Sequence, residues 1–363
     1  MEFALTADQK MMQESVRRTL ERECTLDRIR DRERSHWQMY YILGALSDLG
    51  VPRVLIPEAK AGLGLTLLDA ALIAEALGRY AAPVPFIGSY VMAPLALSGA
   101  GSEMQQRNYL SGLATGERIA GVAVSEQASG AREGAGIAVK NGRLSGKSMF
   151  VLDFAEASFY IVADKSGGLH IVDEDAKGLK KTPLSTIDVT RTVGELIFDD
   201  VEAEPLTCGN PAATLERMID AGRIMLAADT LGAGERTLEN AVAYAKERKQ
   251  FGRVIASFQA VKHMCAEMAA ELEPCRALVW YAAYGFDAQP DQSRRLAAHA
   301  KAHTSEVGPF VARTATEVHG GMGFTDLLGL HYWFKRIGFN RQVLGGPERA
   351  RDDAARAQGW MGN

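Results

Sequence analysis

The sequence predicts a mainly helical protein with a β-domain in its middle. Apolar residues recur at helical spacing over residues 1 to about 115 and again from about 211 onward. Between about 117 and 205 the chain changes to short alternating segments bounded by turn residues. We therefore expect domains at 1–115, 116–207 and 208–363, since a chain of this length holds two or three packed sub-regions.

The N-terminal region begins with a helix-capping motif. Thr6-Ala7-Asp8-Gln9 has the hydroxyl and the amide of a capping box. Apolar residues follow at helical spacing, at Met11, Met12, Val16 and Leu20. A second amphipathic helix is predicted from Leu67 to Gly78, where a glycine and then Pro83 and Pro85 end it.

The middle region has the pattern of antiparallel strands. Strands are expected at Ile119–Val124 and on both sides of the Asn141-Gly142 pair, which is a strong hairpin signal. Three further short strands are expected, at Phe159–Val162, Leu169–Val172 and Leu196–Phe198. Short strands at this spacing predict a small antiparallel barrel or sandwich.

The last part of the chain is predicted to form long helices. One apolar stripe joins Leu231, Leu238, Val242 and Ala245. Another joins Phe258, Val261, Met264 or Cys265, Met268 and Leu272. Long amphipathic helices of this kind usually pack as an antiparallel bundle.

Composition and charge favour a soluble enzyme or scaffold over a nucleic-acid or membrane protein. The chain is 47% hydrophobic and 24% charged, with a net charge of −4. The four cysteines form no CxxC pair, which is typical of reduced thiols in a cytosolic protein. Neither a signal peptide nor an apolar run of membrane-spanning length is found, so we expect a cytoplasmic protein.

Three features are typical of a dinucleotide site, although each has an ordinary structural alternative. Arg248 stands near a helix end and could grip a phosphate, or simply complement the helix dipole. Gln259, eleven residues later, could bind a ligand or cap a helix. His319-Gly320-Gly321-Met322-Gly323 could expose backbone donors, or form a helix C-terminal turn.

Two other patterns are set aside. Gly232-Ala233-Gly234 lies within a helical stripe and does not follow a strand, so it is not a Rossmann fingerprint. His299, His303 and Glu306 have the spacing of metal ligands on a helix face, but their alanine-rich surroundings favour ordinary surface residues. No metal site is expected.

The chain contains Glu247-Arg248-Lys249-Gln250-Phe251-Gly252, then Ser257-Phe258-Gln259, and later the segment from His319 to Arg336. Together these segments resemble the FAD-binding region of the acyl-CoA dehydrogenase family. The resemblance extends over the whole chain. It includes Phe3–Gln9, Ile56–Gly64, Glu75–Gly78, Thr190-Arg191 and Ala82–Phe86. The last of these, with the segment from His319, is similar to a bacterial branch that often pairs unlike subunits and acts on steroid, dicarboxylic or other unusual acyl-CoA thioesters.

The resemblance implies a helical N-terminal domain, a small antiparallel β-barrel and a C-terminal four-helix bundle. It further implies non-covalent FAD, an acyl-CoA substrate, and electron-transferring flavoprotein as oxidant of the reduced flavin. A homo- or hetero-oligomer is expected, with α2β2 as one possibility. No nucleic acid and no membrane insertion is expected.

Site residues are also implied by the resemblance. Arg248, Phe251 and Gln259 would contact the FAD of a neighbouring subunit. The turn that contains Glu317, Gly320 and Gly321 would meet its pyrophosphate. Four residues would lie along the isoalloxazine ring, namely Val122, Val124, Ser125 and Phe150.

The family needs a carboxylate base to remove the α-proton of the acyl group, and both usual positions lack one here. They are occupied by Leu344 and Gly222. Asp220 and Glu348 are the nearest acids, so they are the candidate catalytic residues. Asp220, with Arg223, is also a candidate for substrate binding.

Several flavin-side positions depart from the family pattern as well. Ser125 and Gln127 replace a threonine and a proline, Phe150 replaces a tryptophan, and Leu152 a hydroxyl residue. Glu317 replaces a glutamine, and a carboxylate there is repelled by phosphate unless it is protonated or turned away.

Two classes of function follow. The first is an FAD-dependent acyl-CoA dehydrogenase that forms a 2,3-enoyl-CoA, either with a relocated base or as one half of a heteromer whose partner supplies the base. The second is a catalytically incomplete subunit or scaffold that keeps the fold without turnover. Flavin content, measured for the chain alone and with its partner, separates them.

Overall fold

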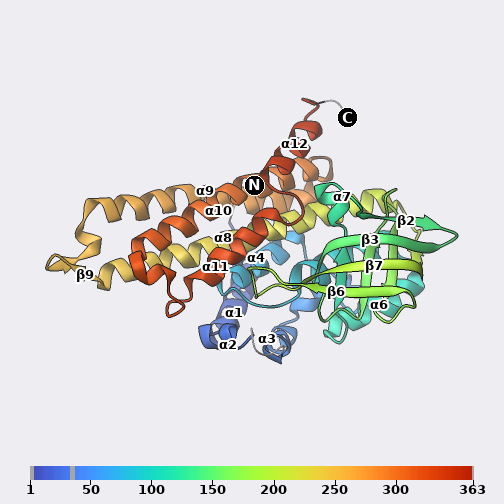
Figure 1. Ribbon diagram of the computed structural model, residues 1–363, viewed down its shortest axis with the longest axis horizontal. Coiled ribbons are helices and arrows are strands. Elements are labelled where there is room, and N and C mark those ends of the chain that lie inside the picture. Colours follow the sequence, from blue (N-terminus) through green and yellow to red (C-terminus); the bar gives the residue numbers. More distant parts are fainter. Residues whose placement is uncertain (1–3, 33–36, 362–363) are drawn as a thin grey trace.

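The computed structural model describes residues 4–32 and 37–361. Helices come first along the chain, a β-sheet follows, and long helices end it (Figure 1). This order confirms the predicted fold class. Within the described residues, no helix has the length and apolar content needed to cross a membrane.

The N-terminal region consists of α-helices joined by short turns. The helices are α1 (Ala7–Glu23), α2 (Leu26–Arg32), α3 (Trp37–Asp48), α4 (Leu67–Arg79), α5 (Ala93–Ala100) and α6 (Glu103–Thr115), with a π-helical segment η3 (Phe86–Met92). The predicted capping box at the start of α1 is confirmed. Thr6 accepts a hydrogen bond from the Gln9 amide at 3.2 Å, and the Gln9 side chain accepts one from the Thr6 amide at 3.1 Å.

The middle region is an eight-stranded sheet flanked by the short helix α7 (Ser125–Ser129). Its strands are β1 (Ala120–Ala123), β2 (Gly136–Lys140), β3 (Arg143–Leu152), β4 (Phe159–Ala163), β5 (Leu169–Asp173), β6 (Leu179–Leu184), β7 (Val193–Glu202) and β8 (Glu204–Leu206). The predicted hairpin is present, because Lys140 pairs with Arg143 across Asn141 and Gly142, which have φ values of 52° and 76°.

The sheet differs from the expected antiparallel barrel in two ways. Its strand path, β6-β7-β3-β1-β4-β5-β8, begins and ends at different edges and does not close. In addition, β1 and β4 pair in parallel, with Val122 opposite Ile161. Strand spacing along the sequence does not reveal this, because the long connection through β2 and β3 returns the chain beside β1 in the same direction.

The C-terminal region is a bundle of long helices. These are α8 (Pro211–Glu247), α9 (Gln259–Ala288), α10 (Pro290–His319) and α11 (Leu330–Gln342), followed by α12 (Pro347–Ala357). A short hairpin, β9 (Lys249–Gln250) with β10 (Arg253–Val254), joins α8 to α9. A 3₁₀ turn, η5 (Gly320–Phe324), joins α10 to α11.

A buried ionic network fixes the bundle to the rest of the chain. Asp229 on α8 accepts two hydrogen bonds from Arg336 on α11, at 2.9 and 2.7 Å, and one from Arg191 at 2.8 Å. Asp229 and Arg336 are fully enclosed, so each charge depends on its partner. This network ties α8, α11 and the loop before β7 together.

Candidate active site

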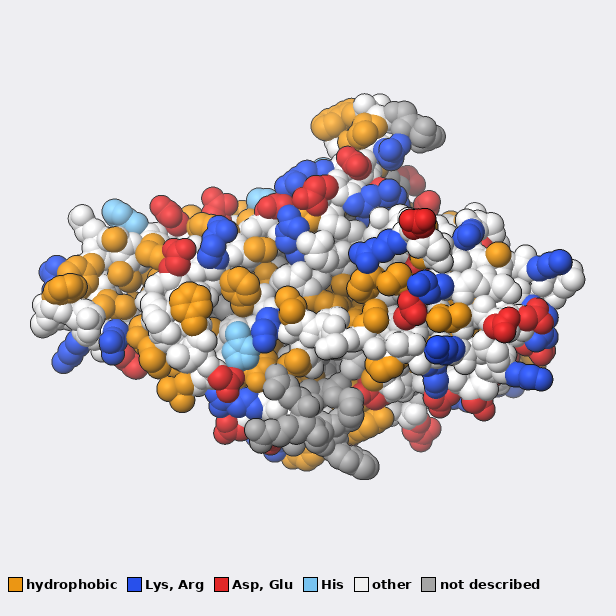
Figure 2. Space-filling view, in the orientation of Figure 1, with side chains coloured by type: hydrophobic (Ala, Val, Ile, Leu, Met, Phe, Trp, Pro, Cys, Tyr) orange, Lys and Arg blue, Asp and Glu red, His pale blue; other side chains and the backbone are white. Residues whose placement is uncertain are grey.

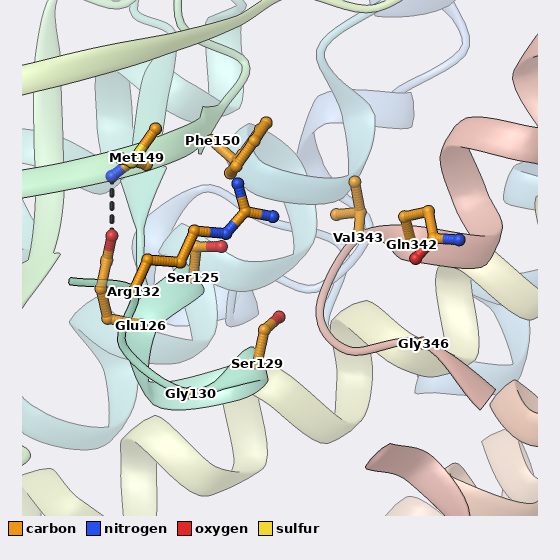
Figure 3. A pocket seen from close by; sticks show the side chains of 10 residues that line it. All are labelled: Ser125, Glu126, Ser129, Gly130, Arg132, Met149, Phe150, Gln342, Val343 and Gly346. Carbon is orange, nitrogen blue, oxygen red and sulfur yellow. Dashed lines mark hydrogen bonds between the residues drawn. The ribbon is translucent and has the colours of Figure 1, made fainter. Parts of the chain in front are cut away.

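A cavity of about 260 Å³ lies between the sheet and the C-terminal helices (Figure 3). It is bounded by α7, by the end of β3, and by the loop that connects α11 to α12. Its lining residues are Ser125, Glu126, Ser129, Gly130, Arg132, Met149, Phe150, Gln342, Val343 and Gly346. Two of the four predicted isoalloxazine contacts, Ser125 and Phe150, are among them.

Side-chain hydrogen bonds hold α7 at the edge of this cavity. Glu126 accepts from the hydroxyl of Ser148 and from the amide of Met149, both at 2.7 Å, which joins α7 to β3 (Figure 3). Gln127 donates to the backbone carbonyl of Asp164 at 2.6 Å. Val122 and Val124, the other two predicted contacts, are buried and do not line the cavity.

Gly222 and Leu344, the two positions expected for a base, come together at one point, and that point is filled with apolar atoms. A Cβ atom placed on Gly222 would lie 2.5 Å from Cδ1 of Leu344 and 2.9 Å from the sulfur of Met92. Leu344 is 2% exposed and Met92 is fully buried. Among the described residues, the atoms nearest to a Cβ on Gly222 therefore belong to Leu344 and Met92, and none is a carboxylate.

Asp220 is buried on another face of α8. Burial raises its pKa to about 6, although Arg294 and Arg223 oppose the shift. Its carboxylate lies 3.6 Å from Arg294, on the side where α8 meets α10. A raised pKa suits a general base, but Asp220 does not line the cavity.

Glu348 has the opposite properties. Its side chain is 73% exposed and lies 3.4 Å from Arg341. Its own backbone amide and Arg341 lower its pKa. An exposed, paired carboxylate with a lowered pKa is a poor proton acceptor for a weak carbon acid.

Buried cations hold the loop that carries Leu344. Arg223 donates to the Leu344 carbonyl at 2.9 Å and to the Ala128 carbonyl at 3.3 Å, and it pairs with Asp353 at 2.7 Å. Lys301 donates to the carbonyls of Asn340 and Arg341 at the end of α11. Arg223 therefore acts here as a structural residue, joining α7, the loop and α12.

The remaining predicted FAD contacts lie at the far end of the bundle. Arg248, Phe251 and Gln259 are exposed on or beside the β9–β10 hairpin, with Phe251 92% exposed. Figure 2 shows hydrophobic and basic side chains together on this end of the molecule. Side chains exposed in this way are free to contact a second molecule.

The glycine turn lies at the same end as the hairpin. The rings of Tyr244 on α8 and His319 on α10 are 4.6 Å apart, which brings the two helix ends together. Gly320 has φ 58° and ψ −140°, a conformation open almost solely to glycine. Glu317, Gly320 and Gly321 are all exposed, so backbone donors and a carboxylate face outward together.

The β9–β10 hairpin lies at one end of the molecule, far from α7 and β3, which border the cavity (Figure 1). Arg248 and Gln259 cannot approach Ser125 and Phe150 of the same chain. A ligand that contacts both groups must lie between two protomers. The expectation that the hairpin serves a neighbouring subunit stays a prediction.

Family models match both helical parts of the chain. Residues 6–117 match the acyl-CoA dehydrogenase N-terminal domain, and residues 212–359 match the acyl-CoA dehydrogenase C-terminal domain. The chain belongs to the acyl-CoA dehydrogenase family. Acyl-CoA dehydrogenases are oxidoreductases that use FAD, and the structural relative PigA is known with FAD bound.

Three relatives illustrate the range of this family. Acyl-CoA dehydrogenase IpdE2 of Mycobacterium tuberculosis is 32% identical over 83% of this chain and 80% of its own. CarC of Acetobacterium woodii, a subunit of a caffeyl-CoA reductase–Etf complex, is 27% identical over 87% of this chain and 88% of its own. The structure of the ChsE4–ChsE5 complex of M. tuberculosis matches with a TM-score of 0.90 at 25% identity, covering 100% of both chains.

Sequence reasoning missed three residues of the site. Arg132 lines the cavity, Met92 packs against Gly222, and Lys301 holds the end of α11. A lysine in an alanine-rich helical pattern was a signal for Lys301, since such a pattern is buried here. Met92 carried no signal, because it lies far from Gly222 and Leu344 in the sequence.

Proposed function

We propose that this chain is one subunit of a heteromeric, FAD-dependent acyl-CoA dehydrogenase. The complex would oxidise an acyl-CoA thioester, of a lipid or steroid side chain, to its 2,3-enoyl-CoA in the cytoplasm. Electrons would pass to electron-transferring flavoprotein. One observation carries the proposal: the residues expected to bind FAD are exposed at the hairpin end, whereas the expected base positions, Gly222 and Leu344, are packed with Met92.

The residues at the hairpin end fit the phosphate part of FAD held by a partner subunit. Arg248 supplies a guanidinium and Gln259 an amide, and Gly320 and Gly321 supply a backbone that a phosphate can approach closely. At the cavity, Ser125 and Phe150 would line the ring system of FAD held by this chain. When bound, FAD supplies the hydride acceptor.

The proton acceptor belongs to the partner subunit in this proposal. Leu344 carries no group that takes up a proton, and a side chain at Gly222 has no room. Asp220 and Glu348 are the two acids of this chain that must still be excluded as the proton acceptor. The complete site would therefore lie on the partner, while this chain contributes Arg248, Phe251 and Gln259 to that partner's cofactor.

The proposal is tested by flavin content and by bleaching with acyl-CoA. The chain is purified alone and together with the protein encoded beside it. The heteromer should be yellow and should lose this colour when acyl-CoA reduces its flavin. The chain alone should show no such loss of colour. Colourless protein from both preparations would contradict FAD binding and favour a scaffold.

Replacing Arg248 by alanine tests the contribution across the subunit boundary. Loss of a charged hydrogen bond to phosphate costs about 1.5–3 kcal/mol, so FAD should bind about tenfold more weakly or worse. Lys246→Ala, an exposed cation two residues earlier, is the matched control and should keep its flavin. Equal flavin stoichiometry in the two variants would refute the role of Arg248.

A further inference from the structure

The cavity beside α7 contains a cation that none of the sequence patterns assigned. The guanidinium of Arg132 lies over the ring of Phe150, 4.6 Å from its centroid. Figure 3 shows the side chain crossing the cavity toward Phe150. Among the ion pairs of residues 4–32 and 37–361, none involves Arg132.

The carboxylate in the cavity wall does not neutralise this cation by pairing with it. Both oxygens of Glu126 accept hydrogen bonds from β3, one from Ser148 and one from the Met149 amide. In Figure 3 the Glu126 carboxylate is directed at β3, whereas Arg132 extends the other way, toward Phe150. The other polar side chains of the lining, Ser125, Ser129 and Gln342, are uncharged.

We propose that Arg132 raises the reduction potential of FAD bound in this cavity by stabilising the reduced ring. The inference rests on the proposed function, in which the isoalloxazine lies against Ser125 and Phe150. Two electrons and one proton convert the neutral oxidised ring into an anion. A guanidinium already placed over Phe150 favours that anion over the neutral ring.

The test measures the midpoint potential of FAD in the purified heteromer in which this chain holds flavin. Arg132→Gln should shift the potential to a more negative value, because it removes the charge and keeps a polar side chain. Arg132→Lys should restore most of the potential, since it retains the charge. The shift should shrink as salt is raised, because Arg132 is exposed to solvent.

Arg143→Gln is the matched control in the same domain. Arg143 pairs with Asp200 at 2.8 Å, outside the cavity, so its loss should leave the potential unchanged. An Arg132→Gln protein with the wild-type potential would overturn the inference, whether its FAD binds more tightly or its KM for acyl-CoA rises. The first result would show that Arg132 only occupies the flavin's place, and the second that it contacts substrate.

Failure of the proposed function looks different. If neither the wild-type chain nor its heteromer retains any flavin, the proposed function fails and the role of Arg132 fails with it. If the heteromer holds flavin only in the partner subunit, the inference about Arg132 fails and the proposed function stands. If flavin is retained and its midpoint potential is the same in Arg132→Gln and wild type, the inference about Arg132 fails and the proposed function is unaffected.

Discussion

The hairpin end of the bundle and the region around Gly222 differ in whether their side chains are exposed or packed together. At the hairpin end, Arg248 and Gln259 are exposed, and Gly320 keeps a backbone shape that other residues avoid. Around Gly222, the side chains of Leu344 and Met92 are packed into the space that a base would need. The first region leaves its polar groups exposed, and the second encloses apolar side chains.

The physical reason is that burying an apolar side chain stabilises the fold, whereas burying a carboxylate destabilises it. Burying a leucine side chain contributes about 1.5–3 kcal/mol, so Leu344 strengthens the contact between α8 and its neighbours. A carboxylate in the same place would need to be buried without a partner, which costs several kcal/mol.

The largest expected effect comes from forcing a carboxylate into the packed region. Gly222→Glu places a side chain against Leu344 and Met92, at 2.5 and 2.9 Å from its first atom. Overpacking and an unpaired buried charge together should lower the free energy of unfolding by at least about 4 kcal/mol. Urea unfolding measures the loss.

Two further variants test whether the packing of Leu344 causes this loss of stability. Gly222→Glu combined with Leu344→Ala should lose less than the sum of the single variants, because the second change makes room for the first. Gly44→Glu, on an exposed face of α3 with no atom within 4 Å of the added Cβ, should be tolerated. Strict additivity in the double variant would show that Leu344 does not fill the site.

A smaller effect, dependent on pH, is expected at Asp220 beside the packed region. Burial raises its pKa from 3.8 to about 6, so the folded protein keeps a proton that the unfolded chain releases over this range. Wild-type stability should therefore fall, relative to Asp220→Asn, as pH rises from about 4 to about 6. Above that range the asparagine variant should be more stable by about 3 kcal/mol.

The free energy of unfolding of wild type and of Asp220→Asn is measured at pH 4 and at pH 7.5. Asp352→Asn, at an exposed carboxylate on α12, is the matched control. A constant difference between wild type and Asp220→Asn would mean that Asp220 ionises as easily in the folded chain as in the unfolded one. If Asp220→Asn also abolished bleaching in the heteromer, Asp220 would regain its place as a candidate base.

The smallest effect is expected in the glycine turn at the hairpin end. Gly320→Ala forces alanine into a conformation that costs about 1–3 kcal/mol, although a Cβ there meets no atom within 4 Å. Gly321→Ala also meets no atom, and its φ is not in the left-handed region, so stability should change by less than about 0.5 kcal/mol. Thermal unfolding compares them, and equal losses would contradict the conformational reason.

Gly321→Ala also separates the two regions by function. If a phosphate approaches the turn as proposed, this variant should lose flavin affinity while remaining as stable as wild type. An unchanged affinity would mean that the turn is structural. The hairpin end would then resemble the region around Gly222 more closely than the exposure of its residues indicates.

Local patterns predicted helices and turns well, because their causes lie within a few residues. The capping box at Thr6 and the Asn141-Gly142 hairpin are both present as expected. The closed barrel was wrong, because closure and the parallel pairing of β1 with β4 depend on where distant strands return. Arg248, Phe251 and Gln259 are exposed together, which the sequence implied through family resemblance and not through spacing.

Sequence by itself determined the family, the order of helical and β regions, and the lack of a carboxylate at Leu344 and Gly222. These are properties of residue identity and of short-range periodicity. Tertiary structure alone decided that Leu344, Gly222 and Met92 meet at one point, and that Arg132 lies over Phe150. It also placed the hairpin far from α7 and β3, because the long helices α8 and α9 carry the hairpin at one end of the bundle (Figure 1).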